Sequence, residues 1–330
     1  MTTETMTPPA PYVVTFGETM ALFRTERPGP LVHAGAVALG IGGAESNVAI
    51  GLQRLGVQAV WCGRIGADAL GELVRREIQA EGVVVHAVKD PAAPTGLMVK
   101  EQRTPSVQRV TYYRAGSAAS RIAPPDVNPA LIAGAAVVHA TGITPALSEQ
   151  AAATWRHVIG AARAAGVLVS LDMNYRSALW NAQAAARVYR DVLPMVDVLF
   201  AGEDEAAIAL GLQSAEHQGE VGPEELARRL AGMGPAQVVI KRGAAGAYAL
   251  VDGSEFVQQA VRIEPVDTVG AGDAFVAGYL AELVRGLPPA ERLHTAARTG
   301  AFACLTQGDW EGLPRRSELG ILEAREPVVR

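Results

Sequence analysis

The residues of this sequence that are best suited to chemistry are two glycines and an aspartate in front of an apolar segment. Gly270 and Gly272 let the backbone approach a ligand closely, and the amides of residues 270–273 would point outward from the start of a helix that continues to Val284. Such a position would bind a phosphate or a developing oxyanion. Asp273 would lie within reach of the same anion, where a carboxylate could accept a proton from an incoming hydroxyl group.

Helix capping is the alternative role for Asp273, because aspartate is a good N-cap residue. The two glycines and the preceding Asp267 and Thr268 favour the anion site, since a cap requires none of them. In either role the carboxylate would face helix amides, which favour its charged form. We therefore expect Asp273 to be a weak base with a low pKa.

The composition is that of a globular chain, because 49% of the 330 residues are hydrophobic, 19% are charged and the net charge is −5. Nucleic acid is not an expected partner, since the arginines are spread along the chain and the lysines are only Lys89, Lys100 and Lys241. No apolar run approaches the length of about eighteen residues that a membrane span needs. Cys62 and Cys304 are expected to be reduced thiols of a cytoplasmic protein, and residues 1–11 a disordered lead.

Short apolar segments alternate with longer alanine-rich segments along the chain. The apolar segments predict buried strands, and the alanine-rich segments have the periodicity of helices that cover a sheet. We expect an α/β fold with a mostly parallel sheet and a ligand beyond the carboxyl ends of its strands. The predicted strands are residues 12–16, 59–62, 136–140, 167–171, 196–200 and 238–240, and the predicted helices are residues 44–55, 70–81, 150–165, 184–193 and 223–232.

Residues 22–39 and 95–117 break this alternation. They are rich in Thr, Val, Tyr, Arg and Pro, and they alternate in part between apolar and polar residues. We expect them to form a small second sheet that projects from the core. Because this sheet would lie beside the cleft at the strand ends, it is a candidate lid.

Residues 36–50 have some features of a dinucleotide-binding fingerprint, with glycines between an apolar run and a helix. The match is poor, because Glu45 stands at the third glycine position and no acidic residue for a ribose follows the next strand. A Walker A loop is also missing from the sequence, since none of the lysines follows a glycine. A nucleotide would have to be bound by other means.

Two motifs, in this order and at this separation, are similar to the signatures of the ribokinase-like (PfkB) carbohydrate kinases. The first is Gly42-Gly-Ala-Glu-Ser-Asn-Val-Ala49, followed by Gly63-Arg-Ile-Gly66, and the second is Asp267-Thr-Val-Gly-Ala-Gly-Asp-Ala-Phe275. The resemblance covers residues 12–313 and implies one kinase domain with a three-layer ribokinase-like fold, followed by a C-terminal tail or helix at 314–330. Within the family the chain is most similar to the 2-keto-3-deoxygluconate kinases, through residues 112–118, 142–147, 171–176, 241–246 and 308–312.

This resemblance implies ATP-dependent phosphorylation of the 6-hydroxyl group of 2-keto-3-deoxygluconate. Asp273 would be the base, and the amides of Gly270, Ala271 and Gly272 would stabilise the γ-phosphoryl group together with Mg²⁺. A loose transition state tolerates a weak base, because the hydroxyl group keeps its proton until late. The alternatives are a kinase of the ribokinase or fructokinase type and a non-catalytic sugar-acid sensor on the same fold.

A sugar acid carries a carboxylate, which an arginine fork binds with two hydrogen bonds. Arg114 and Arg176 are the candidates for this contact, although Arg114 could be a solvated residue of the lid and Arg176 could form an ion pair or contact the nucleotide phosphates. Tyr112 could donate its hydroxyl group to the substrate or pack in the lid. The resemblance adds five residues to the substrate site, of which the fourth could instead begin a helix: Gly43, Ala44, Glu45, Asn47 and Asp309.

The nucleotide is expected at the carboxyl end of the strand that precedes Lys241 and Arg242. A hairpin turn would explain the glycines that follow, but not the two basic residues. By resemblance, ATP lies at this strand end and its phosphates contact an asparagine that follows another strand. The predicted ATP site consists of Asn174, Arg176, Lys241, Arg242, Gly243, Gly246, Gly270 and Gly272.

Magnesium binding is where the sequence departs from the family pattern. Many members have an Asn-x-x-Glu element after a central strand, whereas here Gly202 stands at the asparagine position and Glu205 is left to hold a magnesium-bound water. Glu203 could share this role, or both acids could simply begin a helix. The family also implies a monovalent cation such as K⁺ near Asp267. The histidines lie too far apart in the sequence to predict a zinc site.

We expect a homo-oligomer that assembles through the lid sheet. Its apolar residues would otherwise be exposed, and the candidates for the shared face are Leu97, Val99, Val107 and Val110. The other partners are small molecules, ATP and the sugar acid. The sequence does not separate gluconate-derived from galactonate-derived acids, because they differ only in stereochemistry at C4.

Overall fold

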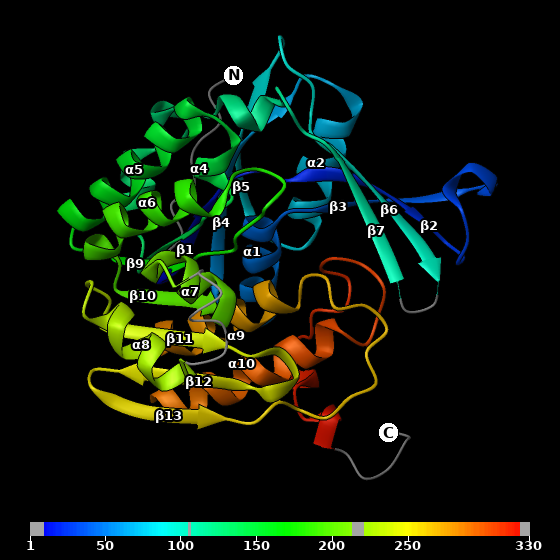
Figure 1. Ribbon diagram of the computed structural model, residues 1–330. Helices are drawn as coiled ribbons and strands as arrows, with labels where there is room; N and C mark the ends of the chain where they lie inside the picture. Colours follow the sequence, from blue (N-terminus) through cyan, green and yellow to red (C-terminus); the bar gives the residue numbers. More distant parts are fainter. Residues whose placement is uncertain (1–9, 105–106, 213–220, 324–330) are drawn as a thin grey trace.

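A nine-stranded sheet forms the centre of the computed structural model, which describes residues 10–104, 107–212 and 221–323 (Figure 1). The strand order is β13-β12-β11-β10-β9-β8-β1-β4-β5. All neighbours from β11 to β5 are parallel, and β12 and β13 are antiparallel. The strands are β1 Tyr12–Phe16, β4 Gln58–Gly66, β5 Val84–Asp90, β8 Val137–Thr141, β9 Leu168–Asp172, β10 Val198–Gly202, β11 Gln237–Lys241, β12 Ala247–Val251 and β13 Ser254–Gln258.

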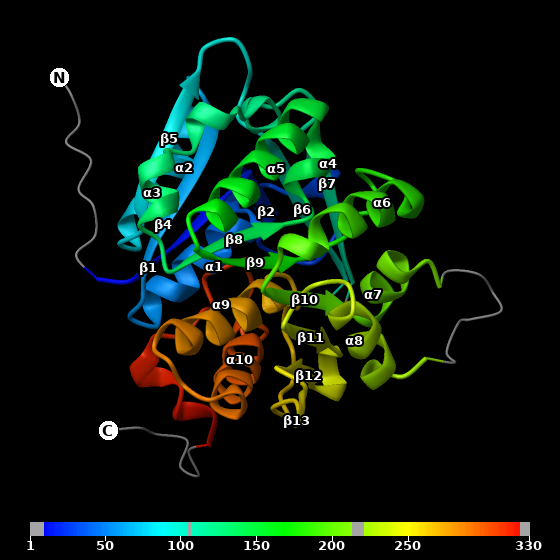
Figure 2. The ribbon, with the colours of Figure 1, turned by 90° about the vertical axis from the view of Figure 1, so that its left-hand side faces the viewer.

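Helices cover both faces of this sheet, as the alternating sequence pattern predicts (Figure 2). One face packs against α1 Ala44–Arg54, α2 Ala69–Ala80, α9 Ala271–Val284 and α10 Pro289–Ala303. The other packs against α5 Glu149–Ala164, α6 Ala182–Val192, α7 Glu203–Leu210 and α8 Pro223–Ala231, with the short α3 Pro129–Ala133 and α4 Thr144–Leu147 nearby.

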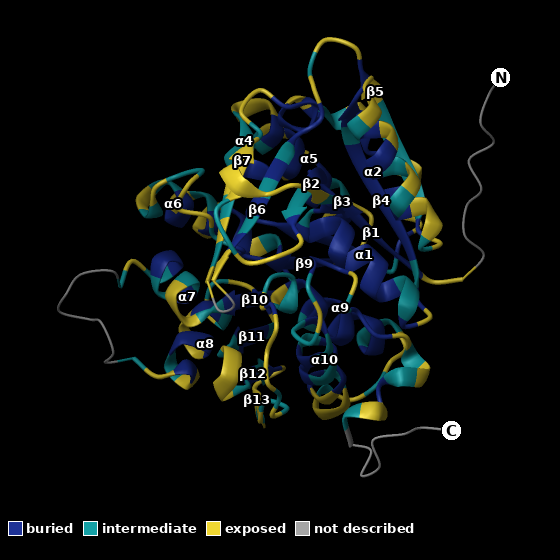
Figure 3. Ribbon diagram, turned by 90° about the vertical axis from the view of Figure 1, so that its right-hand side faces the viewer, coloured by how far each residue is buried: buried dark blue, intermediate teal, exposed yellow. Residues whose placement is uncertain are grey.

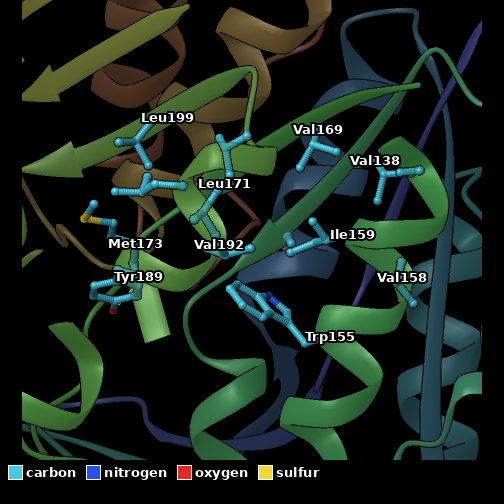
Figure 4. Close-up of a cluster of buried hydrophobic side chains, with 14 of the residues drawn as sticks. Val138, Trp155, Val158, Ile159, Val169, Leu171, Met173, Tyr189, Val192 and Leu199 are labelled. Carbon is cyan, nitrogen blue, oxygen red and sulfur yellow. Dashed lines mark hydrogen bonds between the residues drawn. The ribbon is translucent and has the colours of Figure 1, made fainter. Parts of the chain in front are cut away.

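A hydrophobic core lies on each face of the sheet. The core beneath α5, α6, α7 and α8 contains Trp155 of α5, which is fully buried (Figure 4). It lies under Val138 of β8 and Val169 of β9, and Tyr189 of α6 closes the same cluster. Alternate residues of each strand enter the two cores, because successive side chains of a strand point to opposite faces. The three-layer α/β architecture is therefore the expected one.

Each predicted strand and helix is present, with ends that differ by a few residues. Strand β5 was not predicted, because it lies at the sheet edge and most of its residues are only half-buried, including His86 and Lys89. Short 3₁₀ turns connect the elements at Leu31–His33, Ala118–Arg121, Pro124–Asp126, Leu193–Met195, Gly243–Ala245, Arg316–Glu318 and Ile321–Glu323. The predicted disordered lead lies mostly outside the described residues, as does the end of the C-terminal segment.

A second sheet of four strands projects from the body, as predicted (Figure 1). Its order is β3-β2-β6-β7, with β2 Met20–Thr25, β3 Val37–Gly42, β6 Leu97–Thr104 and β7 Val107–Tyr113. We call it the lid sheet. Its inner face is partly closed by a small apolar cluster of Met20, Leu22 and Met98. Much of β7 is exposed (Figure 3).

The register of the lid sheet corrects one prediction about its outer face. Val110 pairs with Lys100 and packs against the inner cluster, so it does not share a face with Val99, which pairs with Thr111. The outer face instead carries Leu39 next to Phe23 and Val99. Periodicity alone could not decide this, because a shift of one residue exchanges the two faces of a strand.

Neither cysteine forms a disulfide: Cys62 is buried, which raises the pKa of its thiol to about 12, and Cys304 is half-buried. Within the ranges that the structure describes, none of the helices has both the length and the apolar character needed to cross a bilayer.

Candidate active site

A cavity of about 750 Å³ lies at the carboxyl ends of β9, β10 and β11, between the start of α9 and the lid sheet. This is the position that a parallel sheet predicts for a ligand. Residues from distant parts of the sequence line it together. Of the residues predicted from the sequence, it is lined by Tyr112, Asn174, Arg176, Glu205, Lys241, Arg242, Gly270, Gly272, Asp273 and Asp309.

Asp273 is held in the wall of this cavity by two asparagines. Asn47 donates its side-chain amide to Oδ2 of Asp273 at 2.8 Å, and Asn174 donates to Oδ1 at 3.4 Å. Asn174 adopts a left-handed backbone conformation with φ of 41°, which few residues other than glycine tolerate. The two amides orient the carboxylate toward the cavity, where only 8% of the Asp273 surface is exposed.

The environment of Asp273 corrects the expectation of a weak base. Burial raises the pKa of this carboxyl group to about 7, and the neighbouring charge of Asp172 adds to the rise. The hydrogen bond from Asn47 and the positive charges of Arg176 and Lys241 act in the opposite direction but do not outweigh burial. The loss of solvation dominates because a carboxylate is poorly stabilised away from water. Asp273 therefore changes protonation state near neutral pH, as a general base should.

The anion site predicted beside Asp273 begins at Gly270, which has a left-handed φ of 77° and precedes α9. A Cβ atom at this position would lie 2.0 Å from the carbonyl oxygen of Asp309, so the turn needs both the conformation and the small size of glycine. The amide of Ala271 donates to the carbonyl oxygen of Thr268 at 3.4 Å, whereas the next two amides of α9 have no carbonyl partner earlier in the helix. They and the helix dipole favour an anion at this end of the cavity.

Four basic side chains line the cavity, and three of them lie at or after the ends of strands of the main sheet. Nζ of Lys241 lies 2.7 Å from both carboxylate oxygens of Asp172, and Nε of Arg242 lies 3.1 Å from Glu203. Arg176 is exposed in the cavity, and among the described residues it forms no ion pair. It is therefore the cation that has its hydrogen-bonding groups available for a ligand.

Lys100 is a cavity residue to which sequence reasoning gave no role. Its ammonium group, on lid strand β6, lies 2.5 Å from Asp267 and 3.4 Å from Asp309. Burial raises the pKa of Asp309 to about 6, whereas the bonds from Lys100 lower the pKa of Asp267 against the effect of burial. The signal in the sequence was a lysine in a lid strand directly after three apolar residues, 97–99.

Arg114 does not line the cavity. Its guanidinium is paired with the buried Glu18, with Nε 2.7 Å from Oε2, and Ser117 donates its hydroxyl group to the other oxygen of the same carboxylate. The centre of the guanidinium also lies 5.6 Å from the ring centroid of Tyr112, which does line the cavity. Arg114 therefore contacts the ring of Tyr112 without lining the cavity itself.

The first of the two family motifs, residues 42–49, lies behind the cavity wall and contributes no residue to the lining. Glu45 is fully buried and accepts hydrogen bonds from the hydroxyl groups of Thr141 and Thr144 at 2.6 and 3.0 Å, and burial raises its pKa. A Cβ atom on Gly43 would lie 2.4 Å from the carbonyl oxygen of Glu18, so this glycine is required for packing. Five more predicted residues are not in the cavity lining: Ala44, Asn47, Gly243, Gly246 and Ala271.

Glu205 has a clear structural contact at the site. One of its carboxylate oxygens accepts the amide of Tyr175 at 2.8 Å and the other accepts the amide of Gly202 at 2.7 Å, so it caps α7 and fixes the segment that carries Asn174 and Arg176. A carboxylate has about four acceptor positions, so two remain for a metal-bound water. The described residues contain no cluster of three metal-ligating side chains.

Comparison with known proteins identifies the family of the chain. The model of the pfkB family carbohydrate kinases matches residues 10–316. The chain is 36% identical to a 2-dehydro-3-deoxygluconokinase from Bacillus subtilis over 320 residues, which cover 96% of each chain, and 34% identical to a 2-dehydro-3-deoxygalactonokinase from Haloferax volcanii, with 90% and 92% covered. The crystal structure of a candidate Ribokinase II from E. coli, in complex with ATP and Mg²⁺, has a TM-score of 0.85 at 22% identity and covers 96% of this chain and 100% of that chain. The fold is thus ribokinase-like, and the chain belongs to the pfkB family of carbohydrate kinases.

Proposed function

We propose that the protein transfers the γ-phosphoryl group of ATP to the 6-hydroxyl group of 2-keto-3-deoxygluconate, giving 2-keto-3-deoxy-6-phosphogluconate in sugar-acid catabolism. The observation that carries this proposal is a buried carboxylate, Asp273, with a pKa of about 7, beside the Gly270 turn. It shares one cavity with Arg176, which forms no ion pair with any residue that the structure describes. The names of the relatives that share over a third of their residues with the chain support the same substrate class. A cytoplasmic location stays a prediction.

The reaction follows from positions more than from covalent chemistry. Asp273 accepts the proton of the 6-hydroxyl group while the hydroxyl oxygen forms a bond to the γ-phosphorus and the bond to ADP breaks. The amides of Gly270 and Gly272, which line the cavity on either side of Ala271, would face the charge on the phosphoryl oxygens. Lys241 and Arg242 line the same cavity and, although each is paired with a carboxylate, would bind the other phosphates of ATP.

Mg²⁺ would neutralise phosphate charge when it is bound with ATP. The E. coli neighbour is a complex with both ATP and Mg²⁺. The residues present fit an ion that keeps most of its ligands from phosphate and water. Glu205 would order one of these waters through its two remaining acceptor positions, as predicted. Asp204, which also lines the cavity and is exposed, offers a second carboxylate in the same segment.

The sugar acid would extend from Asp273 toward the lid sheet. Its 6-hydroxyl group lies at Asp273, and its carboxylate accepts two hydrogen bonds from Arg176. Tyr112 and Asp309 line the same cavity and would bind the hydroxyl groups between these ends. Arg114 acts through Tyr112 in this arrangement, because its own charge is paired with Glu18.

A substrate panel tests the proposed function directly. ADP formation is measured with ATP, Mg²⁺ and each of five acceptors: 2-keto-3-deoxygluconate, 2-keto-3-deoxygalactonate, gluconate, fructose and ribose. We expect the first to have the highest kcat/KM. A preference for fructose or ribose would overturn the sugar-acid assignment in favour of another sugar kinase. If ADP forms with none of the acceptors, the result would favour the alternative of a non-catalytic sugar-acid sensor.

The pH dependence of kcat/KM should follow the protonation of Asp273. Its pKa is about 7, and only the ionised form can accept a proton, so activity is lost as the pH falls. Well below pH 7 we expect a decrease of about tenfold per pH unit. Because phosphate groups also titrate near pH 6, ATP binding is measured by calorimetry over the same range as the control. A profile that stays flat down to pH 5 would contradict the role of Asp273.

We also propose a homo-oligomer through the outer face of the lid sheet. Leu39 is 57% exposed there, and Val37 is 41% exposed on the same edge strand. We expect Leu39→Lys to produce monomers in analytical ultracentrifugation, because a charge in an apolar interface loses its solvation. Val257→Lys, at an apolar residue on β13 of the main sheet that is 65% exposed, is the matched control. Wild-type protein that sediments as a monomer would rule this interface out.

A further inference from the structure

The ammonium group of Lys100 lies against Asp267, the residue near which the family resemblance implies a monovalent cation. Lys100 and Asp267 form an ion pair in which both side chains are almost completely buried, with exposed fractions of 2% and 1%. The same ammonium group reaches Asp309. These two acids flank the Gly270 turn, since Asp267 precedes it in sequence and the carbonyl group of Asp309 packs against Gly270.

A separate cation does not fit on Asp267 while Lys100 is present. Oδ1 of Asp267 accepts the amide of Val269 at 3.0 Å, and Oδ2 accepts both Lys100 and the amide of Gly308, at 2.5 and 3.3 Å. A metal ion at Oδ2 would lie next to the ammonium group, and two like charges at that distance in a buried site repel strongly. Three of the about four acceptor positions of this carboxylate are therefore already used by donors.

We propose that Lys100 is the built-in monovalent cation of the Gly270 turn, so that the protein requires no K⁺. Through Asp267 the ammonium group fixes the amide of Val269, and through Asp309 it fixes the segment against which Gly270 packs. It thereby holds the anion-binding amides in place and adds positive potential behind them. Lys100 is a positioning residue in this proposal. Its link to turnover rests on the proposed kinase function.

Lys100 also connects this turn to the lid sheet, because it extends from β6. The pairing of β6 with β7 carries this link to Tyr112, which lines the same cavity. A metal ion bound at Asp267 would provide the charge but not the covalent connection to the lid. Loss of Lys100 should therefore change both the cation requirement and the placement of the lid.

The test replaces Lys100 by Met, which fills the space of the lysine stem and leaves the place of the ammonium group open. Activity and thermal stability are measured in KCl, NH₄Cl, NaCl and tetramethylammonium chloride at equal ionic strength. We expect the wild-type rate and Tm to be the same in all four salts. In tetramethylammonium, Lys100→Met should lose about 10²-fold in kcat, as misplaced groups at an active site do. K⁺ and NH₄⁺ should restore part of the rate and raise its Tm, because binding to the folded state is stabilising.

Two controls accompany this variant. Lys89→Met removes an exposed lysine of β5 and should behave as wild type in every salt. Lys100→Arg keeps a cation at the site and should stay independent of K⁺. If Lys100→Met does not fold, Lys100→Gln takes its place.

Activation or thermal stabilisation of the wild-type protein by K⁺ would overturn the proposal. So would a loss of activity in Lys100→Met without any response of its rate or Tm to K⁺ or NH₄⁺. If the wild-type protein phosphorylates none of the sugars, the proposed function fails, and the dependence of Tm on the salt still decides whether Lys100 takes the place of the ion.

Discussion

Asp273→Asn is expected to reduce kcat for 2-keto-3-deoxygluconate by about 10³-fold while leaving ATP and sugar-acid binding nearly unchanged. Asparagine has the size of aspartate and can still accept the hydrogen bond from Asn47, but it cannot accept a proton from the 6-hydroxyl group. Turnover is measured with saturating substrates and binding by calorimetry. A kcat close to that of the wild type in this variant would contradict the assignment of Asp273 as the base.

The same variant has an opposite expected effect on stability, which separates loss of chemistry from loss of structure. The ordinary pKa of 3.8 applies in the unfolded chain and a pKa of about 7 in the folded protein, so the stability of the wild type falls as the pH rises between these values. Asp273→Asn removes this ionisation. We expect its Tm to exceed that of the wild type at pH 8 and the difference to shrink at pH 5. Asp191→Asn, an exposed residue of α6, should change neither Tm nor kcat.

Much of the fold was predictable because a buried parallel sheet imposes a strong pattern on the sequence. Strands such as Val198–Gly202 are nearly all apolar, since both of their faces are covered. Strand β5 lacked this pattern because it lies at the edge of the sheet. The lid sheet was predicted as a unit but not in register. Val110 shows why, since its face depends on which residue of β6 it opposes.

Site residues could be predicted where one segment of the chain contains all of them, as with Gly270 and Asp273. Contacts between residues of two different segments were harder to predict. Asp172 and Lys241 end the strands on either side of β10, and the register that brings them together places Asp172 beside Phe200 and Lys241 beside Gly202. Asn47 was expected to contact the sugar, and instead it donates to Asp273 from the neighbouring helix. A sequence shows the polar groups, whereas the fold decides which of them pair with each other.

Ion pairing in the folded protein also decides between the two arginines proposed to bind the sugar carboxylate. The charge of Arg114 is compensated by Glu18 in a buried pair, and breaking such a pair leaves an isolated charge. Arg176 has no such partner among the described residues and lies in the cavity with Asp273. Arg114→Ala should therefore act mainly on stability, and Arg176→Ala mainly on the reaction.

Arg176→Ala is expected to reduce kcat/KM for 2-keto-3-deoxygluconate by about 10²-fold, which corresponds to about 3 kcal/mol for charge-assisted hydrogen bonds to a carboxylate. Most of this loss should appear in KM for the sugar acid. Any activity with fructose should change much less, because fructose has no carboxylate for Arg176 to bind. Arg187→Ala, at an exposed arginine of α6, should leave both substrates unaffected.

The alternative role of Arg176, contact with the nucleotide phosphates, makes a different prediction for the same variant. In that case KM for ATP rises and the acceptors lose activity equally, so the preference for the sugar acid over fructose is retained. A second readout is independent of both substrates, because the charge of Arg176 lowers the pKa of Asp273. Its removal should shift the acid limb of the kcat/KM profile to higher pH, since the base then ionises less readily. An unchanged acid limb would mean that Arg176 does not act on Asp273 at all, and an unchanged preference for the sugar acid would assign this arginine to ATP.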